Sequence, residues 1–441
     1  MRILSQRRPE LLFLVSMLIL ACALIVRARQ PVSQVAIDTA GSAPAPVSLS
    51  TEEMISRLQA QLKDDPENSA AYAQLGLALL QRVRETGDPQ LYTQAATALD
   101  AALKRNPNEL DAVIGEGSLA LSLHHFSDAL RWGNQAHSIN PYRAEIYGII
   151  GDAQLELGQY DAADATFQKM VNTRPDLSSY SRISYLREIY GESDAAISAM
   201  QMAVQAGGPA TENTLWTQYQ LGMLYFNRGD LVNAERAYRQ ALQVNPDYAY
   251  ALSGLAGVRA AQGSYPEAIA MYQQAINRLP LPAFVISLCD LYQVTGDSTN
   301  AKAQSDLLHA MEQLAASTGV DVDMELALFD ADHGADPGQT VLRARSAYSH
   351  RPSIYAADVL AWSLYQAQQY SEARHYSQLA LRLGTRDALL HFHAGMIARA
   401  LADTTTSRSE LTQALQVNPF FSLRYSRMAR ETLDQEARSA P

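Results

Sequence analysis

Apolar residues recur at three- and four-residue spacing along most of the chain, which is the period of an amphipathic helix. Two such stripes follow one another between Tyr147 and Pro175, with Gly158 between them. Glycine permits a tight turn between two helices, and proline ends the second helix because it has no amide hydrogen to donate. The pattern therefore predicts an all-α fold built from pairs of amphipathic helices.

The predicted helix pairs recur with a fixed period. Prolines stand 34 residues apart at Pro107, Pro141, Pro175 and Pro209, and the same interval separates Pro246 and Pro280. Pro66 precedes Pro107 by 41 residues, and we expect the seven extra residues to form a loop within 81–88. A constant period of this length is typical of stacked repeats, each of which buries its apolar face against the next.

The boundaries of the repeat array follow from capping signals and composition. Helical signals begin at Ser50, which lies three residues before Glu53, the spacing of a capping box. The expected segments are a flexible Ala/Pro/Ser linker over 30–49, a leading helix over 50–68, the repeats over 69–419, and a capping helix with a tail over 420–441.

The first 29 residues contain an uncharged apolar run from Leu11 to Val26, preceded by three arginines. Such a run is expected to enter a membrane. We favour an uncleaved signal anchor with the repeats outside the cytoplasm, because the arginines favour a cytoplasmic N-terminus. Cleavage near Cys22, followed by secretion, is the alternative. A lipoprotein site at Cys22 is disfavoured because Leu20 is bulky and the residues after the cysteine are apolar.

Composition narrows the classes of partner. The 441 residues exceed one compact core, and 47% of them are hydrophobic, so most of the chain is expected to fold. The formal net charge of −11 opposes a general affinity for nucleic-acid phosphates. We therefore expect no nucleic-acid partner. Cys22 and Cys289 form no disulfide framework, and Cys289 is expected to pack as a small hydrophobic residue.

One unit carries the repeat motif in full. It comprises Leu221, Gly222, Tyr225, Gly229, Ala234, Tyr238, Ala241 and Pro246. This motif resembles the tetratricopeptide repeat family, and the resemblance extends from about Ser69 to Pro419 as ten units. It implies a right-handed superhelical solenoid in which the first helix of each pair lines a concave groove. The run 353–401 also resembles bacterial repeat proteins.

The stretch from Leu281 to Pro352 departs most from the family pattern. Two units are still expected there, marked by Gly296 and Gly334. The second helix of the first of these units is expected to continue through Glu312 and Ala316.

The resemblance implies which side chains face the groove and bind a partner. They form two aromatic patches, one of Trp216, Tyr219, Met223 and Phe226 and one of Tyr355, Asp358, Trp362, Tyr365, Phe392 and Met396. Exposed aromatic side chains in a groove can seat an extended peptide or a helix. The alternative is that they pack between neighbouring repeats.

Charge along the predicted groove favours a neutral or basic partner segment. The expected acidic residues are Glu145, Asp152, Glu156, Glu188, Asp290, Glu325 and Asp358. The family's carboxylate clamp of lysine, asparagine and arginine is missing. Its positions carry Gly148, Asp152, Ser181, Tyr185, Ser253 and Gly257, which cannot neutralise a carboxylate.

No motif predicts catalysis, a metal or a cofactor. The sequence contains no phosphate-binding glycine loop, nucleophile elbow or HExxH. Neither His124-His125 nor the pair His391 and His393 has the i, i+4 spacing that places two ligands on one helix face. We predict a membrane-tethered scaffold that binds a protein partner. The alternative is an accessory subunit that presents a glycan to a polymer-handling enzyme, because aromatic side chains also stack on sugars.

Overall fold

The computed structural model describes residues 49–208 and 211–439, which form twenty-two helices and no strand. The predicted all-α solenoid is confirmed. The predicted anchor over 11–26 and most of the predicted linker lie outside the described residues. Within the described ranges, no helix combines the length and the hydrophobicity needed to cross a membrane.

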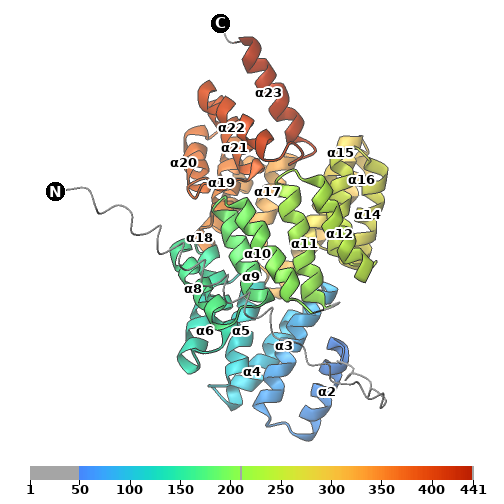
Figure 1. Ribbon diagram of the computed structural model, residues 1–441, viewed down its shortest axis with the longest axis vertical. Coiled ribbons are helices and arrows are strands. Elements are labelled where there is room, and N and C mark those ends of the chain that lie inside the picture. The colour runs from blue at the N-terminus through green and yellow to red at the C-terminus, as the bar shows by residue number, and fades with distance from the viewer. Residues whose placement is uncertain (1–48, 209–210, 440–441) are drawn as a thin grey trace, which may run out of the picture. The chain divides into compact units, whose positions relative to one another are not determined.

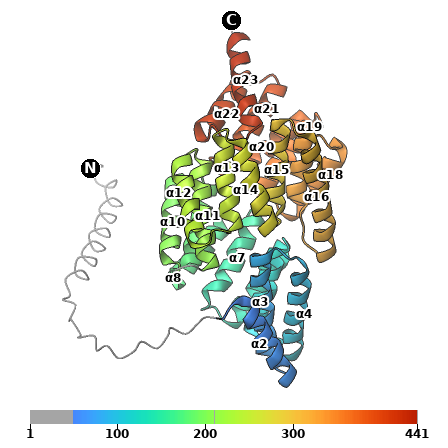
Figure 2. The same ribbon diagram turned by 90° about the vertical axis from the view of Figure 1, so that its right-hand side faces the viewer.

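Ten helix pairs follow one another between a leading helix, α2 (Thr51–Asp64), and a final helix, α23 (Tyr425–Ser439). These two helices lie at opposite ends of the stack (Figures 1 and 2). The first five pairs are α3 (Ser69–Thr86) with α4 (Gln90–Arg105), α5 (Leu110–Ser122) with α6 (Phe126–Ile139), α7 (Ala144–Glu156) with α8 (Tyr160–Thr173), α9 (Leu177–Ile189) with α10 (Ser193–Ala206), and α11 (Glu212–Asn227) with α12 (Leu231–Val244).

The second five pairs complete the array. They are α13 (Ala249–Ala261) with α14 (Tyr265–Arg278), α15 (Pro282–Thr295) with α16 (Ser298–Thr318), α17 (Asp323–His333) with α18 (Pro337–His350), α19 (Ile354–Gln366) with α20 (Tyr370–Ala380), and α21 (Ala388–Ala400) with α22 (Thr404–Val417). The predicted extension of α16 through Ala316 is confirmed, and Gly296 and Gly334 end α15 and α17 in the left-handed conformation.

Two expected boundaries were wrong. The seven extra residues before Gly87 lengthen α3 rather than form a loop, because Leu80 and Val83 continue its buried stripe. The helix ends where Gly87 adopts a φ of 70°, which glycine tolerates best. Helix α23 begins at Tyr425 and not near 420, so the preceding residues form an irregular segment inside the fold.

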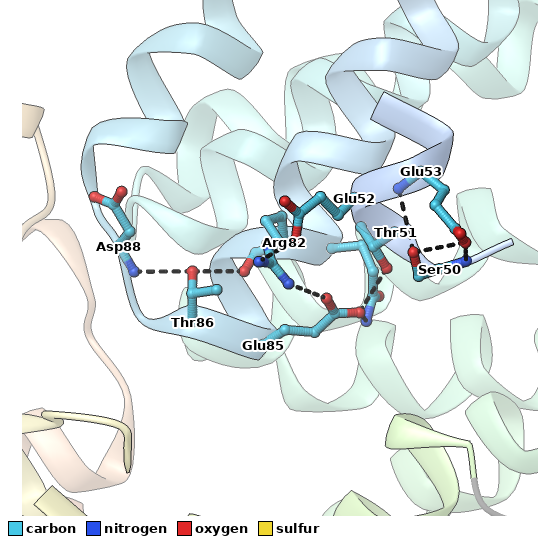
Figure 3. A network of polar contacts seen from close by, with 9 residues as sticks. Ser50, Thr51, Glu52, Glu53, Arg82, Glu85, Thr86 and Asp88 are labelled. Carbon is cyan, nitrogen blue, oxygen red and sulfur yellow. Dashed lines mark hydrogen bonds and ion pairs between the residues drawn. The ribbon is translucent and has the colours of Figure 1, made fainter. Parts of the chain in front are cut away.

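The leading helix is attached to the array by polar contacts (Figure 3). The predicted capping box is confirmed, since the Glu53 amide donates to Ser50 Oγ at 3.2 Å and the Ser50 amide donates to Glu53 Oε2 at 2.8 Å. Thr51 Oγ1 donates to Glu85 Oε1 of α3 at 2.6 Å. Buried Leu58 and Leu62 add an apolar contact, so α2 covers the first face of the stack.

Glycines allow the two helices of a pair to approach each other. A Cβ atom at Gly151 would lie 2.3 Å from the ring of Phe167, and one at Gly222 would lie 2.3 Å from the ring of Tyr238. Both aromatic rings come from the second helix of the pair and lie against the backbone of the first. The small residues of the repeat motif therefore mark direct helix contacts.

Hydrogen bonds also join parts of the array that are far apart in sequence. His124 Nδ1 lies 2.6 Å from the Asp321 carbonyl oxygen, and the Ile354 amide donates to Tyr160 Oη at 2.8 Å. Thr385 donates to the Ile189 carbonyl. The partners in these contacts are 194 to 197 residues apart, which is between five and six repeats of 34. The solenoid therefore touches itself after one turn, along a line of contacts that we call the seam.

Candidate binding site

A cavity of about 450 Å³ lies between α11, α13, α15, α17 and the segment before α23. Its walls carry the aromatic side chains of Tyr219, Phe226, Tyr272, Phe284 and Phe421. We call it the aromatic cavity. First helices of neighbouring repeats form most of its wall, and Tyr272 reaches it from the second helix α14. Its volume is within the range of natural ligand pockets.

Tyr238 reaches this cavity from the second helix of its pair. Its ring lies between Gly222 and Gly254, where a Cβ atom would come within 2.3 and 2.4 Å of it. The side chain is fully buried and lines the cavity, yet no described group hydrogen-bonds to its hydroxyl. Burial holds the pKa of Tyr238 well above its usual value, so the hydroxyl stays protonated. It is a donor without an acceptor.

The charged groups beside the aromatic cavity already have partners. Asp290 Oδ1 lies 3.1 Å from His333 Nε2. Asp332 Oδ1 accepts hydrogen bonds from Trp362 Nε1 at 2.7 Å and from Tyr425 Oη at 2.6 Å. Arg424 donates to the Asp332 carbonyl oxygen at 2.5 Å. These contacts hold the segment before α23 against α17.

A second cavity of about 200 Å³ lies beside the seam, and we call it the acidic cavity. Two acidic residues and one basic residue line it: Glu188 at the end of α9, Asp387 before α21, and Arg386 beside Asp387 in the chain. Asn227 Nδ2 donates to Glu188 Oε1 at 3.0 Å, and Asp387 accepts from the amides of Leu389 and Leu390 as a helix cap. Within the described residues, neither carboxylate forms an ion pair with lysine, arginine or histidine.

Burial dominates the electrostatics of the acidic cavity. It raises the pKa of Glu188 to about 7, and the nearby charge of Asp387 raises it further, while the hydrogen bond from Asn227 opposes the shift. Burial also raises the pKa of Asp387, with Asp358 contributing in the same direction. Ionising these carboxyls therefore costs free energy.

The two predicted aromatic patches meet in space. Tyr219, Met223 and Phe226 of the first patch line the aromatic cavity. Phe226 also lines the acidic cavity together with Tyr355 of the second patch. Two residues of the patches lie elsewhere. Trp216 is partly buried and lines neither cavity, and Tyr365 stacks on Trp362 with ring centroids 4.6 Å apart.

The rest of the second patch is not exposed in the groove, which corrects the expectation from sequence. Asp358, Trp362, Phe392 and Met396 are only 0 to 7% exposed. Tyr425 of α23 stacks on Phe392 and packs edge-on against Trp362. Asp358 accepts from buried His393, with 2.9 Å between Oδ2 and Nδ1. In this structure the four side chains hold the last repeats together, as the packing alternative proposed.

Most carboxylates of the expected acidic groove already have a basic side chain as partner. Four of its seven carboxylates pair with arginines, at 2.5 to 3.6 Å, and two pair with histidines. Some of the cations come from distant repeats, as in the pairs of Arg351 with Glu156 and Glu325. Only Glu188 of that set has no ion-pair partner among the described residues. Glu188 shares the acidic cavity with Asp387 and with Arg386.

Sequence analysis missed three residues of the site, Tyr238, Asn227 and Asp387. Tyr238 occupies the aromatic motif position of a second helix, which predicts packing only. The glycine at 254 was the available signal that the ring of Tyr238 lies between two first helices. Asp387 lies in the loop before α21 and meets Glu188 only across the seam, so no local pattern indicates it.

The described residues contain no cluster of three or more His, Cys, Asp or Glu side chains placed to hold a metal ion. The buried Sγ of Cys289 donates to the Ala301 carbonyl at 3.4 Å, and burial raises the pKa of the thiol to about 11. The prediction that Cys289 packs as a small hydrophobic residue is confirmed.

Comparison with known proteins identifies the repeats. Residues 90–144 and 219–280 match one family model described as tetratricopeptide repeat, and residues 144–177 match a second with the same description. These parts of the chain are tetratricopeptide repeats. The resemblance inferred from the motif is confirmed there.

The individual relatives are distant. The chain is 26% identical over 232 residues to "Tetratricopeptide repeat protein 37" of Xenopus laevis and 24% identical over 228 residues to "Cellulose synthase operon protein C" of Pseudomonas fluorescens. These matches cover 50% and 48% of this chain but only 14% and 18% of those proteins. The crystal structure of yeast Tom70 is 13% identical, with 89% of this chain and 94% of that one covered at a TM-score of 0.39.

Proposed function

We propose that this chain is a repeat scaffold that binds a partner protein in the aromatic cavity. The observation that supports the proposal is the cavity itself, which lies on the first helices of adjacent repeats and is lined by Tyr219, Met223 and Phe226. Aromatic and methionine side chains around a desolvated pocket are typical of the energetic centre of a protein interface. The stacked helices of the tetratricopeptide repeats hold these side chains in place.

Blocking the cavity tests this function with little change to the frame. A Cβ atom at Gly257 on α13 would lie 3.5 Å from Tyr272 Oη and 3.9 Å from the Phe226 ring, which are ordinary contact distances, and Gly257 itself lines the cavity. We expect Gly257→Phe to abolish recovery of crosslinked partners from cell extracts while the melting temperature changes little. The control is Val232→Phe, which places the same phenylalanine side chain at an exposed position of α12. Equal partner recovery by both variants would exclude the cavity as the binding site.

We further propose that the apolar run over 11–26 tethers the scaffold to a membrane, with the repeats outside the cytoplasm. This part of the proposal rests on the sequence alone. The full chain is expected to remain in the membrane pellet after alkaline extraction, and a variant lacking residues 11–26 is expected in the supernatant. Mass spectrometry of the mature N-terminus distinguishes a retained anchor from a cleaved signal. A full chain that is extracted intact argues against the tether.

A glycan-binding accessory role is the second candidate. Carboxylates and an amide surround the aromatic side chains of the cavity, at Asp290, Asp332 and Asn227, which is the arrangement expected of a sugar site. The similarity to a protein named for a cellulose synthase operon is consistent with this role. Recovery of polymer rather than protein with the unmodified chain, lost in Gly257→Phe, would favour it.

A further inference from the structure

The chain between the last repeat and α23 is longer than the equivalent connections in the array. Where a proline ends a repeat, the next helix begins two or three residues later, as at Pro107 and Leu110. After Pro419, the next helix begins only at Tyr425, six residues later. The residues in between, 420–424, form an irregular segment that we call the strap.

The strap lies against the aromatic cavity. All of its residues line that cavity. Phe421 packs against Phe392 of α21, with ring centroids 5.7 Å apart. Leu423 packs against the core cluster that contains Phe284 and Leu288 of α15. The apolar side chains of the strap therefore join two walls of the cavity that belong to distant repeats.

Polar contacts fix the two ends of the strap. On the N-terminal side, Asn418 Nδ2 donates to the Phe226 carbonyl oxygen at 2.9 Å. On the C-terminal side, Tyr425 Oη donates to Asp332 Oδ1 at 2.6 Å, and Tyr425 is buried. These two anchors lie outside the strap itself, so they can hold the chain in place when the strap moves.

The strap is held less firmly between its anchors. Phe421 and Leu423 are only half-buried, and Phe420 is 36% exposed. The Phe420 amide donates to Asn418 Oδ1 at 2.8 Å, and the Ser422 amide donates to a side chain four residues further on. Among the described residues, no backbone group of the strap bonds to the helices that form the cavity. Its release therefore breaks apolar contacts and no backbone hydrogen bond to those helices.

We infer that the strap is an internal ligand of the binding site, and that the partner protein displaces it with a segment of the same chemistry. That segment carries an aromatic residue in the place of Phe421 and an aliphatic residue two positions later, in the place of Leu423. The inference rests on the proposed function and specifies the partner segment. It also assigns the strap a competing role in binding.

An internal ligand weakens the binding of an external one. A tethered segment competes at an effective concentration of about millimolar, because the tether keeps it beside the site. The apparent affinity for a partner then falls with the fraction of chains whose site is open. Removing the apolar contacts of the strap is therefore expected to strengthen binding.

A peptide with the sequence of residues 418–425 tests the inference on the full chain. The variant is Phe421→Ser with Leu423→Ser, which keeps the anchors Asn418 and Tyr425. We expect the variant to bind the labelled peptide at least tenfold more tightly than the unmodified chain does, as measured by fluorescence anisotropy. A peptide with alanine at both apolar positions is expected to bind neither protein.

The control variant is Met428→Ser with Leu433→Ser on α23. Both side chains are half-buried against the last repeats, and neither lines the cavity. The control is expected to bind the peptide as weakly as the unmodified chain. Leu423→Ser alone leaves Phe421 in place and repeats the test if the double variant of the strap does not fold. It is expected to bind at least threefold more tightly than the unmodified chain.

The outcomes separate the inference from the proposed function. The double variant of the strap is expected to recover more crosslinked partner than the unmodified chain. If its recovery falls or stays the same while Gly257→Phe abolishes recovery, the site binds a partner but the strap is not displaced. Peptide binding that does not rise in the strap variants, or rises equally in the control, also overturns the inference. If recovery is independent of Gly257, the proposed function fails.

Discussion

Arg351→Ala is expected to lower the stability of the folded chain by about 3 kcal/mol, because it leaves the largely buried Glu156 carboxylate without its cation. Arg351 Nε lies 2.5 Å from Glu156 Oε2, and Arg351 Nη1 lies 3.6 Å from Glu325 Oε1. The Arg351 and Glu156 side chains are only 15% and 13% exposed. The guanidinium also lies over the Phe126 ring, 5.2 Å from its centroid. Chemical denaturation followed by circular dichroism measures the loss.

The loss of stability should be specific to the ion pairs that Arg351 forms with Glu156 and Glu325. Lys302→Ala removes an exposed i, i+4 pair with Asp306 and is expected to cost less than about 0.5 kcal/mol. Removing all three charges together, as Arg351→Met with Glu156→Gln and Glu325→Gln, is expected to restore most of the stability. Equal losses for Arg351→Ala and Lys302→Ala would show that the seam contributes little.

Gly222→Ala is expected to destabilise the fold by about 1 to 3 kcal/mol, and Gly222→Leu by more, because both overpack a filled contact. The added Cβ atom would lie 2.3 Å from Cε1 and 2.6 Å from Cδ1 of Tyr238. That ring is fully buried and also lies against Gly254, so a shift away from α11 presses it against the backbone of α13. Thermal melting of both variants measures the effect.

The matched control is Gly257→Ala on the neighbouring first helix. Its nearest contact would be 3.5 Å, an ordinary van der Waals distance. Replacing a helical glycine with alanine then favours the helix by up to about 1 kcal/mol. We expect its melting temperature to equal or exceed that of the unmodified chain. A similar fall in melting temperature for Gly222→Ala and Gly257→Ala would show that overlap with the Tyr238 ring is not the cause of the destabilisation.

The local pattern of residues was sufficient to predict the helices and their number. The spacing of prolines and glycines and the apolar stripes are properties of single repeats, so ten pairs and the capping box at Ser50 were accessible from sequence. The exception before Gly87 is also local in origin. The seven residues in excess of the repeat period were expected to form a loop, but Leu80 and Val83 extend an apolar stripe, and burial of that stripe favours helix.

The candidate site was only partly accessible from sequence. Tyr219, Met223, Phe226 and Tyr355 were predicted to face a groove and do line cavities. Trp362 and Phe392 were grouped with them because they occupy first helices, and helix position does not reveal that Tyr425 covers them. The pairing of most of the predicted acidic groove residues with basic side chains was also not predictable from helix position. Partners such as Arg351 come from distant repeats.

By itself, the sequence determined the class of fold, the repeat period and the helix faces, because each depends on residues within about one repeat of one another. Only the tertiary structure decided which of those faces stay open. A small rotation between successive repeats accumulates until segments 194 to 197 residues apart touch, and no local pattern encodes that sum. The seam brings Glu188 to Asp387 and Phe226 to Tyr355, and so creates the acidic cavity beside the aromatic one.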